Sequence, residues 1–235
     1  MIKRIFRRIF ARNTLYYPGC LLKLAAPDLN DNYIQILTKL RVSFMLIDDF
    51  VCCGSPALNA GYSEDYENLK KKNISMLDKY GIGKIITPCA ACYKMLSKEY
   101  QLGKKGIEVK HVTQILDEKI GRIKRVTNGK ITYHDPCHLG RHCGIYEEPR
   151  NILRAIGFNV QEFSKNKENA VCCGAGAGVK ANFPDTANKI AQKKLKECKT
   201  KTLVTACPLC YAHFKENAPS GLEIKELSQF VKEAL

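Results

Sequence analysis

The chain has 235 residues, a length that allows one large domain or two small ones. Its 45% hydrophobic and 26% charged residues are typical of a globular protein and exclude a disordered chain, and no apolar run is long enough to predict a membrane-spanning helix. The formal net charge is +15, but the cations are scattered and only 9% of the residues are aromatic, so we expect no nucleic-acid partner.

Residues 1–13 form a basic segment whose first part is predicted to be an amphipathic helix. The apolar residues at helical spacing are Ile2, Ile5, Phe6, Ile9 and Phe10. Such a helix binds either an acidic membrane surface or a partner subunit, and both alternatives stay open. The segment lacks the features of a secretory signal, so we expect a cytoplasmic protein, either free or peripheral on the inner face of the membrane.

Residues 14–121 are predicted to be the first of two domains, because short β-rich runs alternate there with amphipathic stretches. The predicted strands are 14–17, 42–47, 84–87 and 107–112, and the predicted helices are 30–40, 63–80, 91–100 and 113–120. A polar link near residues 122–129 ends this half of the chain.

Residues 130–235 are predicted to be the second domain, with the same alternation. The predicted strands are 130–134, 159–163, 202–205 and 222–226, and the predicted helices are 148–156, 184–198, 208–217 and 227–234. This pattern predicts an α/β fold of two tandem Rossmann-like repeats, each a short parallel sheet with flanking helices, related by pseudo-twofold symmetry. Ligands of such sheets bind outside the carboxyl ends of the strands.

The cysteines repeat along the chain at nearly constant offsets of 117 to 120 residues. The first set is Cys20, Cys52, Cys53, Cys89 and Cys92, and the second set is Cys137, Cys172, Cys173, Cys207 and Cys210. The flanking residues repeat as well, as in FVCCGSPALNAG and AVCCGAGAGVKA. In both halves the cysteines follow predicted strands, so each set is expected to gather at one edge of its sheet.

The composition of each set favours an iron–sulfur cluster over zinc. Thiols of a cytoplasmic protein are kept reduced, so twelve cysteines indicate metal ligands more than disulfides. Neighbouring side chains in extended backbone point to opposite sides, so a vicinal pair chelates one zinc ion poorly but reaches two different irons. Five cysteines also exceed the four that a zinc ion or an ordinary cubane cluster needs.

These motifs resemble the CCG cysteine-rich domain of the B-type and D-type subunits of heterodisulfide reductase, which is also similar to iron–sulfur subunits of glycolate, lactate and glycerol-3-phosphate oxidases. The intervals within the sets are 31 and 35 residues in the first copy and 34 and 33 in the second, and the resemblance spans residues 14–235. The segments DPCHLGR and ENAVCCGAGAG look most like the disulfide-reductase branch. The resemblance implies that the ten paired cysteines hold two 4Fe-4S clusters of the noncubane type.

The resemblance also implies an electron-donor subunit that is ferredoxin-like or contains a flavin, because the chain has no ferredoxin-like cysteine motif of its own. His134 and His138 flank Cys137 and are candidate catalytic residues that relay protons to a thiolate. The alternative is that His134 faces the core and His138 bonds to backbone. Cys143 and Cys198 have no counterpart in the repeat, and their roles are left open.

Three functions follow from these expectations. The first is an oxidoreductase subunit of a heterodisulfide-reductase-like complex, in which two clusters transfer electrons to a disulfide or a related acceptor. The second is an electron-relay subunit of a flavin-dependent 2-hydroxyacid or glycerol-3-phosphate dehydrogenase complex that feeds quinone. The third is a cluster-binding structural or sensor protein without turnover. The sequence names neither the substrate, the electron donor nor the direction of flow.

Overall fold

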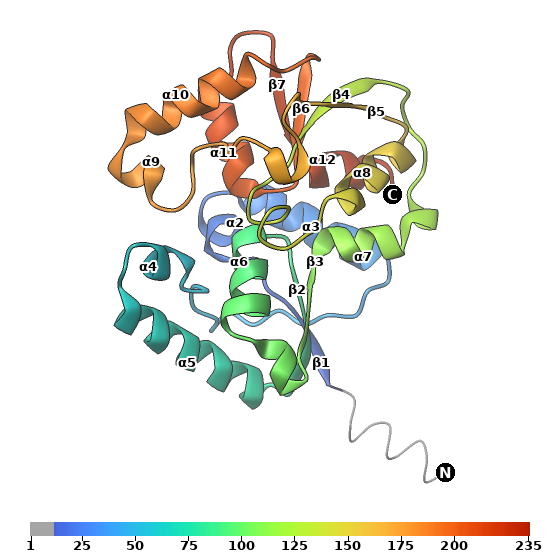
Figure 1. Ribbon diagram of the computed structural model, residues 1–235. Coiled ribbons are helices and arrows are strands. Elements are labelled where there is room, and N and C mark those ends of the chain that lie inside the picture. The colour runs from blue at the N-terminus through green and yellow to red at the C-terminus, as the bar shows by residue number, and fades with distance from the viewer. Residues whose placement is uncertain (1–11) are drawn as a thin grey trace.

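The structure, a computed structural model, describes residues 12–235 and is an α/β protein with two parallel sheets (Figure 1). The first sheet has the strand order β1-β2-β3, and the second has the order β5-β4-β6-β7. Helices flank both sheets. The prediction of an α/β fold with two repeats, each holding a short parallel sheet, is therefore confirmed.

The first sheet consists of β1 (Asn13–Tyr16), β2 (Ile82–Thr87) and β3 (Glu108–His111). Its central strand β2 is rich in isoleucine, and Ile85 and Ile86 are completely buried, as expected for a parallel strand that is covered on both faces. Tyr16 pairs with Ile86, and Thr87 with His111, so the three strands end at the same edge of the sheet.

The second sheet consists of β4 (Lys130–His134), β5 (Asn159–Glu162), β6 (Thr202–Thr205) and β7 (Glu223–Glu226). Its inner strands β4 and β6 are largely buried, whereas β5 at the edge has no fully buried residue. His134 pairs with Thr205, and Thr205 with Glu226. The carboxyl ends of β4, β6 and β7 therefore lie side by side.

The helices follow the strands, as the alternating pattern predicts. They are α2 (Cys20–Leu24), α3 (Pro27–Lys39), α4 (Ser55–Asn59), α5 (Ser63–Lys79), α6 (Ala90–Lys94), α7 (Val112–Glu118), α8 (Glu147–Ile156), α9 (Val179–Asn182), α10 (Pro184–Leu195), α11 (Pro208–Asn217) and α12 (Leu227–Glu233). Proline opens α3, α10 and α11, where its missing N–H group costs no hydrogen bond. The short helices α2, α4 and α9 were not predicted, because about one turn is too short to show a helical period.

The predicted strand at residues 42–47 is wrong. Within the described chain, Met45 is the one residue of this run that forms a β-bridge, and its partner is Leu15 of β1. Its position beside β1 corresponds to the position of β5 beside β4 in the second sheet. No side chain from 42 to 47 is fully buried, so the apolar run lacks the burial that would stabilise a regular edge strand. The predicted helix at 91–100 is also divided, into α6 and a π-helical turn at Met95–Glu99.

The two halves pack together around a common core. Helix α3 packs on α12, and α7 packs on α8, so each contact joins the first half to the second. One continuous cluster of buried apolar side chains includes Leu37 and Val112 from the first half and Leu227 and Val231 from the second. Figure 1 shows the two sheets one above the other, with α2 and α3 at the level where the halves meet.

The domain limits of 14–121 and 130–235 stay predictions. The predicted N-terminal amphipathic helix lies in residues 1–11, outside the described residues. Among residues 12–235, no helix combines the length and the hydropathy needed to cross a membrane.

Candidate functional site

The five cysteines of the first set come from three separate segments and meet at the carboxyl edge of the first sheet. Cys20 opens α2 just after β1, Cys52 and Cys53 precede α4, Cys89 caps α6, and Cys92 lies within α6. The Sγ atoms of Cys20 and Cys52 are 4.0 Å apart. Cys52 also contacts Cys53, Cys53 contacts Cys92, and Cys92 contacts Cys89. The five sulfurs thus form one continuous group.

The second set repeats this arrangement in the same order. Cys137 follows β4, Cys172 and Cys173 lie in the loop before α9, Cys207 directly precedes α11, and Cys210 lies within α11. The Sγ atoms of Cys137 and Cys172 are 3.8 Å apart, and those of Cys173 and Cys210 are 3.2 Å apart. Cys173 also contacts Cys172, and Cys210 contacts Cys207.

Gly19 allows the first set to close. Its φ of +78° lies in the left-handed region that disfavours other residues. A Cβ atom at this position would lie 2.7 Å from the Sγ atom of Cys92 and 3.4 Å from the Cβ atom of Cys89. Any larger residue would therefore displace the cysteines of α6 from Cys20.

Both sets open into one shared cavity of about 330 Å³ between the two halves of the chain. Nine of the ten paired cysteines line it: Cys20, Cys53, Cys89, Cys92, Cys137, Cys172, Cys173, Cys207 and Cys210. Its wall is mostly apolar, with Leu21 and Pro56 from the first half and Ala181 and Leu209 from the second. Two sulfur-rich sites therefore face a single space.

The sulfurs of each set carry strongly unequal pKa values. The pKa of Cys52 falls to about 2, because its contacts with Cys20 and Cys53 favour the thiolate, and the pKa of Cys20 rises because its contact with Cys52 and its burial favour the thiol. In the second set, contacts with Cys137 and Cys173 lower the pKa of Cys172 to about 2. Crowded sulfurs cannot all become thiolates unless a positive charge joins them.

That donor set fits a metal cluster. None of the twelve cysteines, all within the described residues, forms a disulfide. Thiolates bind iron or zinc, and a multinuclear iron–sulfur core supplies several cationic metal ions to one group of sulfurs. A single tetrahedral zinc ion would leave one sulfur of each set unused.

The two candidate histidines lie on different sides of the second set. The His138 ring lines the shared cavity, with its Nδ1 atom 3.3 Å from the Sγ atom of Cys137 and its ring centroid 5.1 Å from that of His142. His134 is fully buried and does not line the cavity. Burial, with a smaller effect of Lys194, lowers the pKa of His134 to about 4.

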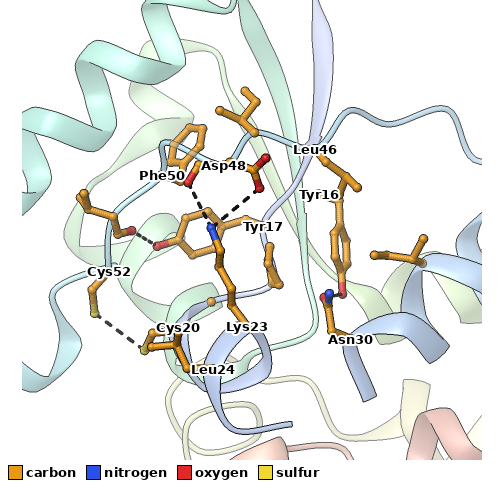
Figure 2. A pocket seen from close by; sticks show the side chains of 15 residues that line it. Tyr16, Tyr17, Cys20, Lys23, Leu24, Asn30, Leu46, Asp48, Phe50 and Cys52 are labelled. Atoms are coloured by element: carbon orange, nitrogen blue, oxygen red, sulfur yellow. Dashed lines mark hydrogen bonds and ion pairs between the residues drawn. The ribbon is translucent and has the colours of Figure 1, made fainter. Parts of the chain in front are cut away.

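A second cavity, of about 420 Å³, lies on the outer side of the first set. Figure 2 shows Cys20 and Cys52 together at one end of it, with Lys23 directed towards Asp48. The Tyr17 hydroxyl donates to the carbonyl of Val51 at 2.7 Å. Cys20 is the one exposed member of the first set, so this set is accessible both from the shared cavity and from the outer cavity.

Some supporting residues were not predicted from the sequence. Asn73 of α5 is fully buried and donates to the carbonyl of Cys52 and to the Tyr100 hydroxyl, which donates to the carbonyl of Cys53. These bonds hold the vicinal pair in place. The signal in the sequence was an asparagine at an apolar position of the helix predicted at residues 63–80. Cys143 and Cys198 line neither cavity, and Cys198 donates to the carbonyl of Thr200.

Comparison with known sequences agrees with this geometry. The profile of the CCG family, described as a cysteine-rich domain, matches residues 14–97 and again residues 131–215. Each match contains one complete set of five cysteines.

Individual relatives are larger proteins. The chain is 34% identical to an uncharacterized iron–sulfur protein of Methanocaldococcus jannaschii, over 86% of the chain and 41% of the relative. It is 32% identical to the D-type subunit of dihydromethanophenazine:CoB–CoM heterodisulfide reductase of Methanosarcina acetivorans, over 95% of the chain and 59% of the relative. It is 36% identical to EtfAB:quinone oxidoreductase of Syntrophomonas wolfei, over 83% of the chain and 30% of the relative. The chain thus spans between about a third and three fifths of these relatives.

Proposed function

The chain belongs to the CCG family of cysteine-rich domain proteins, and we propose that it is the iron–sulfur redox subunit of a heterodisulfide-reductase-like complex. In this proposal it is an oxidoreductase subunit in which two 4Fe-4S clusters of the noncubane type transfer electrons to a disulfide or a related acceptor. The observation that carries the proposal is the shared cavity, because cysteines of both sets line one space of about 330 Å³. Cysteines of both sets beside one space place two one-electron centres where both can act on the same acceptor, as the two-electron reduction of a disulfide requires.

Each set of five cysteines holds one cluster in this proposal: Cys20, Cys52, Cys53, Cys89 and Cys92 the first, and Cys137, Cys172, Cys173, Cys207 and Cys210 the second. The clusters supply one-electron chemistry to the acceptor when bound. The chain itself contributes the apolar wall, which excludes water around the acceptor. His138 lies 3.3 Å from Cys137 and lines the cavity, so its ring can hold a proton beside a thiolate that forms there.

The electron donor in this proposal is a separate ferredoxin-like or flavin-containing subunit. Relatives named as part of a heterodisulfide reductase and as EtfAB:quinone oxidoreductase support an electron-transfer complex. The relay function in a quinone-linked dehydrogenase complex stays the second candidate, favoured by the outer cavity at Cys20, which offers a second approach to the first set.

The metal content tests the cofactor. We expect the anaerobically purified chain to contain about eight irons and eight acid-labile sulfides, since two sites each take a four-iron core. Cys53→Ser and Cys173→Ser should each remove about half of the iron without unfolding the chain, because the ligand sets are separate. The matched control is Cys198→Ser, which should keep all of it, because Cys198 lies outside both cavities.

Two results would contradict this assignment. Zinc without acid-labile sulfide would exclude the clusters, and loss of all iron from one substitution would indicate a single shared site. The acceptor is tested separately by adding an organic disulfide or a water-soluble quinone to the reduced, iron-loaded chain. Two thiols formed per disulfide, with oxidation of the clusters, support the reductase; oxidation by quinone alone supports the relay.

A further inference from the structure

A histidine with unused hydrogen-bonding groups lies behind the second cysteine set. His134 ends β4 and has no exposed surface, and neither of its ring nitrogens has a hydrogen-bond partner in the described protein. A ring nitrogen of His134 and the Sγ atoms of Cys173 and Cys210 all lie within 4.8 Å of one another. Because buried polar groups in folded proteins are nearly always paired, His134 requires a partner at this site.

Thr205, which pairs with His134 across β4 and β6, and Lys194 also leave a buried polar atom without a partner. The acceptors that the structure places within 4.8 Å of a His134 ring nitrogen are the sulfurs of Cys173 and Cys210. The ring meets Phe214 edge to face at a centroid distance of 4.8 Å and Phe163 at 6.5 Å. These aromatic rings fix the orientation of the imidazole and offer it no acceptor for a conventional hydrogen bond. His134 does not line the shared cavity either, so an acceptor that binds in that space is separated from it by the cysteines.

The position equivalent to His134 in the first half of the repeat holds a tyrosine. Tyr17 stands 117 residues before His134, the offset that separates Cys20 from Cys137, and is therefore its counterpart in the repeat. Its hydroxyl donates to the carbonyl of Val51 at 2.7 Å (Figure 2). That bond uses the only hydrogen that the tyrosine side chain can donate. The duplication has thus left a free donor at the second set and none from this position at the first.

We propose that the N–H group of His134 donates a hydrogen bond to a sulfur of the second site and makes the two clusters unequal in reduction potential. This inference rests on the proposed function, since it concerns the cofactor that the cysteines hold. A hydrogen bond to a cluster or thiolate sulfur withdraws electron density and stabilises the more negative, reduced state. The second site is therefore the more easily reduced, and electrons that reach the first site, with its exposed Cys20, pass on to the second. His134 acts as a tuning residue and does not touch the acceptor.

The test is an EPR-monitored redox titration of the full, iron-loaded chain, with iron counted first. His134→Phe should lower the potential of one cluster so that its reduction equilibrium changes about tenfold, or about 59 mV for a one-electron couple. The reduction potential of the other cluster should not change. His134→Gln, whose amide keeps an N–H donor, should restore part of the difference. Tyr17→Phe is the matched control at the first set and should leave both potentials unchanged.

The outcomes separate this inference from the proposed function. A wild-type chain without iron and sulfide overturns both. A fully loaded His134→Phe variant with both potentials unchanged overturns the inference alone. Chains carrying ¹⁵N-histidine should show the weak hyperfine coupling of a hydrogen bond. A strong coupling would identify His134 as an iron ligand and overturn the hydrogen-bond role. Loss of half of the iron in both His134→Phe and His134→Gln would do the same.

Discussion

Arg150 of α8 is a charged residue of the interior, and it organises the loop that carries Cys137. Its side chain is 1% exposed and binds both carboxylate oxygens of Asp135, at 2.7 and 2.8 Å, and those of Glu162. Asp135 also accepts from the backbone N–H of Lys167 at 2.8 Å. Two bidentate pairs therefore join β5, α8 and the segment just before Cys137, which fixes one ligand position of the second site.

Replacing this arginine should be costly. Arg150→Met leaves the nearly buried carboxylate of Asp135 without its cation, which we expect to reduce the free energy of unfolding by about 3 to 5 kcal/mol. The measurement is denaturant unfolding, with iron content determined in parallel. Arg154→Met is the control on the same helix, because the Arg154 side chain is 54% exposed and its ion pair should contribute about 1 kcal/mol or less. Equal effects of the two substitutions would contradict the role given to Arg150.

At the scale of single elements, the last helix of each half begins with the same motif. His111 caps α7 and Glu226 caps α12, and each cap is completed by a glutamine three residues later, Gln114 or Gln229. The Nδ1 atom of His111 accepts from the backbone N–H of Thr113, and Nε2 lies 3.2 Å from the carbonyl of Pro88, so the neutral ring carries its proton on Nε2. Both helices are thus tied to the strand that precedes them.

The cap at His111 predicts a loss of stability in acid. Burial lowers the pKa of His111 to about 3 from an ordinary value of 6.5, so below pH 6.5 the unfolded chain takes up the proton first. Stability should therefore fall with pH from 6.5 towards 3, by up to about 1.4 kcal/mol per pH unit from this group. His111→Asn, a cap that does not titrate, should reduce the slope of this dependence in denaturant unfolding between pH 5 and 7, while His134, whose pKa burial also lowers, keeps part of it. An unchanged slope in the variant would exclude this assignment.

At the scale of the whole molecule, the shared cavity depends on how the two halves are joined. Tyr33 of α3 donates to the carboxylate of Glu226 at 2.6 Å, and both residues are fully buried. The same carboxylate caps α12 through Ser228. One buried acid therefore links the packing of α3 on α12 to the start of a helix, and it holds the halves that carry the two cysteine sets.

Removing the hydroxyl of Tyr33 tests this connection. Tyr33→Phe should lower the free energy of unfolding by about 1 to 3 kcal/mol, because a buried carboxylate loses a donor. Tyr16→Phe is a matched control: its hydroxyl bonds within the first half to Asn30, which is partly exposed, so the lost bond should contribute less. If the hydroxyl holds the halves together, hydrogen exchange should also accelerate in α3 and α12 of the Tyr33 variant. Exchange confined to α3 would argue that it acts only locally.

Much of this protein could be predicted from the sequence, because the signals are local. The order of strands and helices follows from short apolar and amphipathic runs, and the two cysteine sets follow from spacings that are set along the chain. The strand expected at 42–47 failed because its edge position, with no fully buried side chain, depends on neighbours outside the segment. The short helix α2 likewise forms where Gly19 brings the chain against the cysteines of α6, a contact between residues about 70 positions apart.

Only the tertiary structure decided how the local pieces meet. The similar spacings in the two halves do not by themselves fix how the sets lie relative to each other, and the packing of α3 on α12 and α7 on α8 brings both sets to one cavity. The sequence likewise offered His134 and His138 together as catalytic candidates beside Cys137, with a core position for His134 as the alternative. In the structure the strand end turns His134 into the protein and the following loop turns His138 into the cavity. The physical reason is that the spacing of residues is set along the chain, whereas the burial of a side chain is decided by packing between segments that lie far apart in the chain.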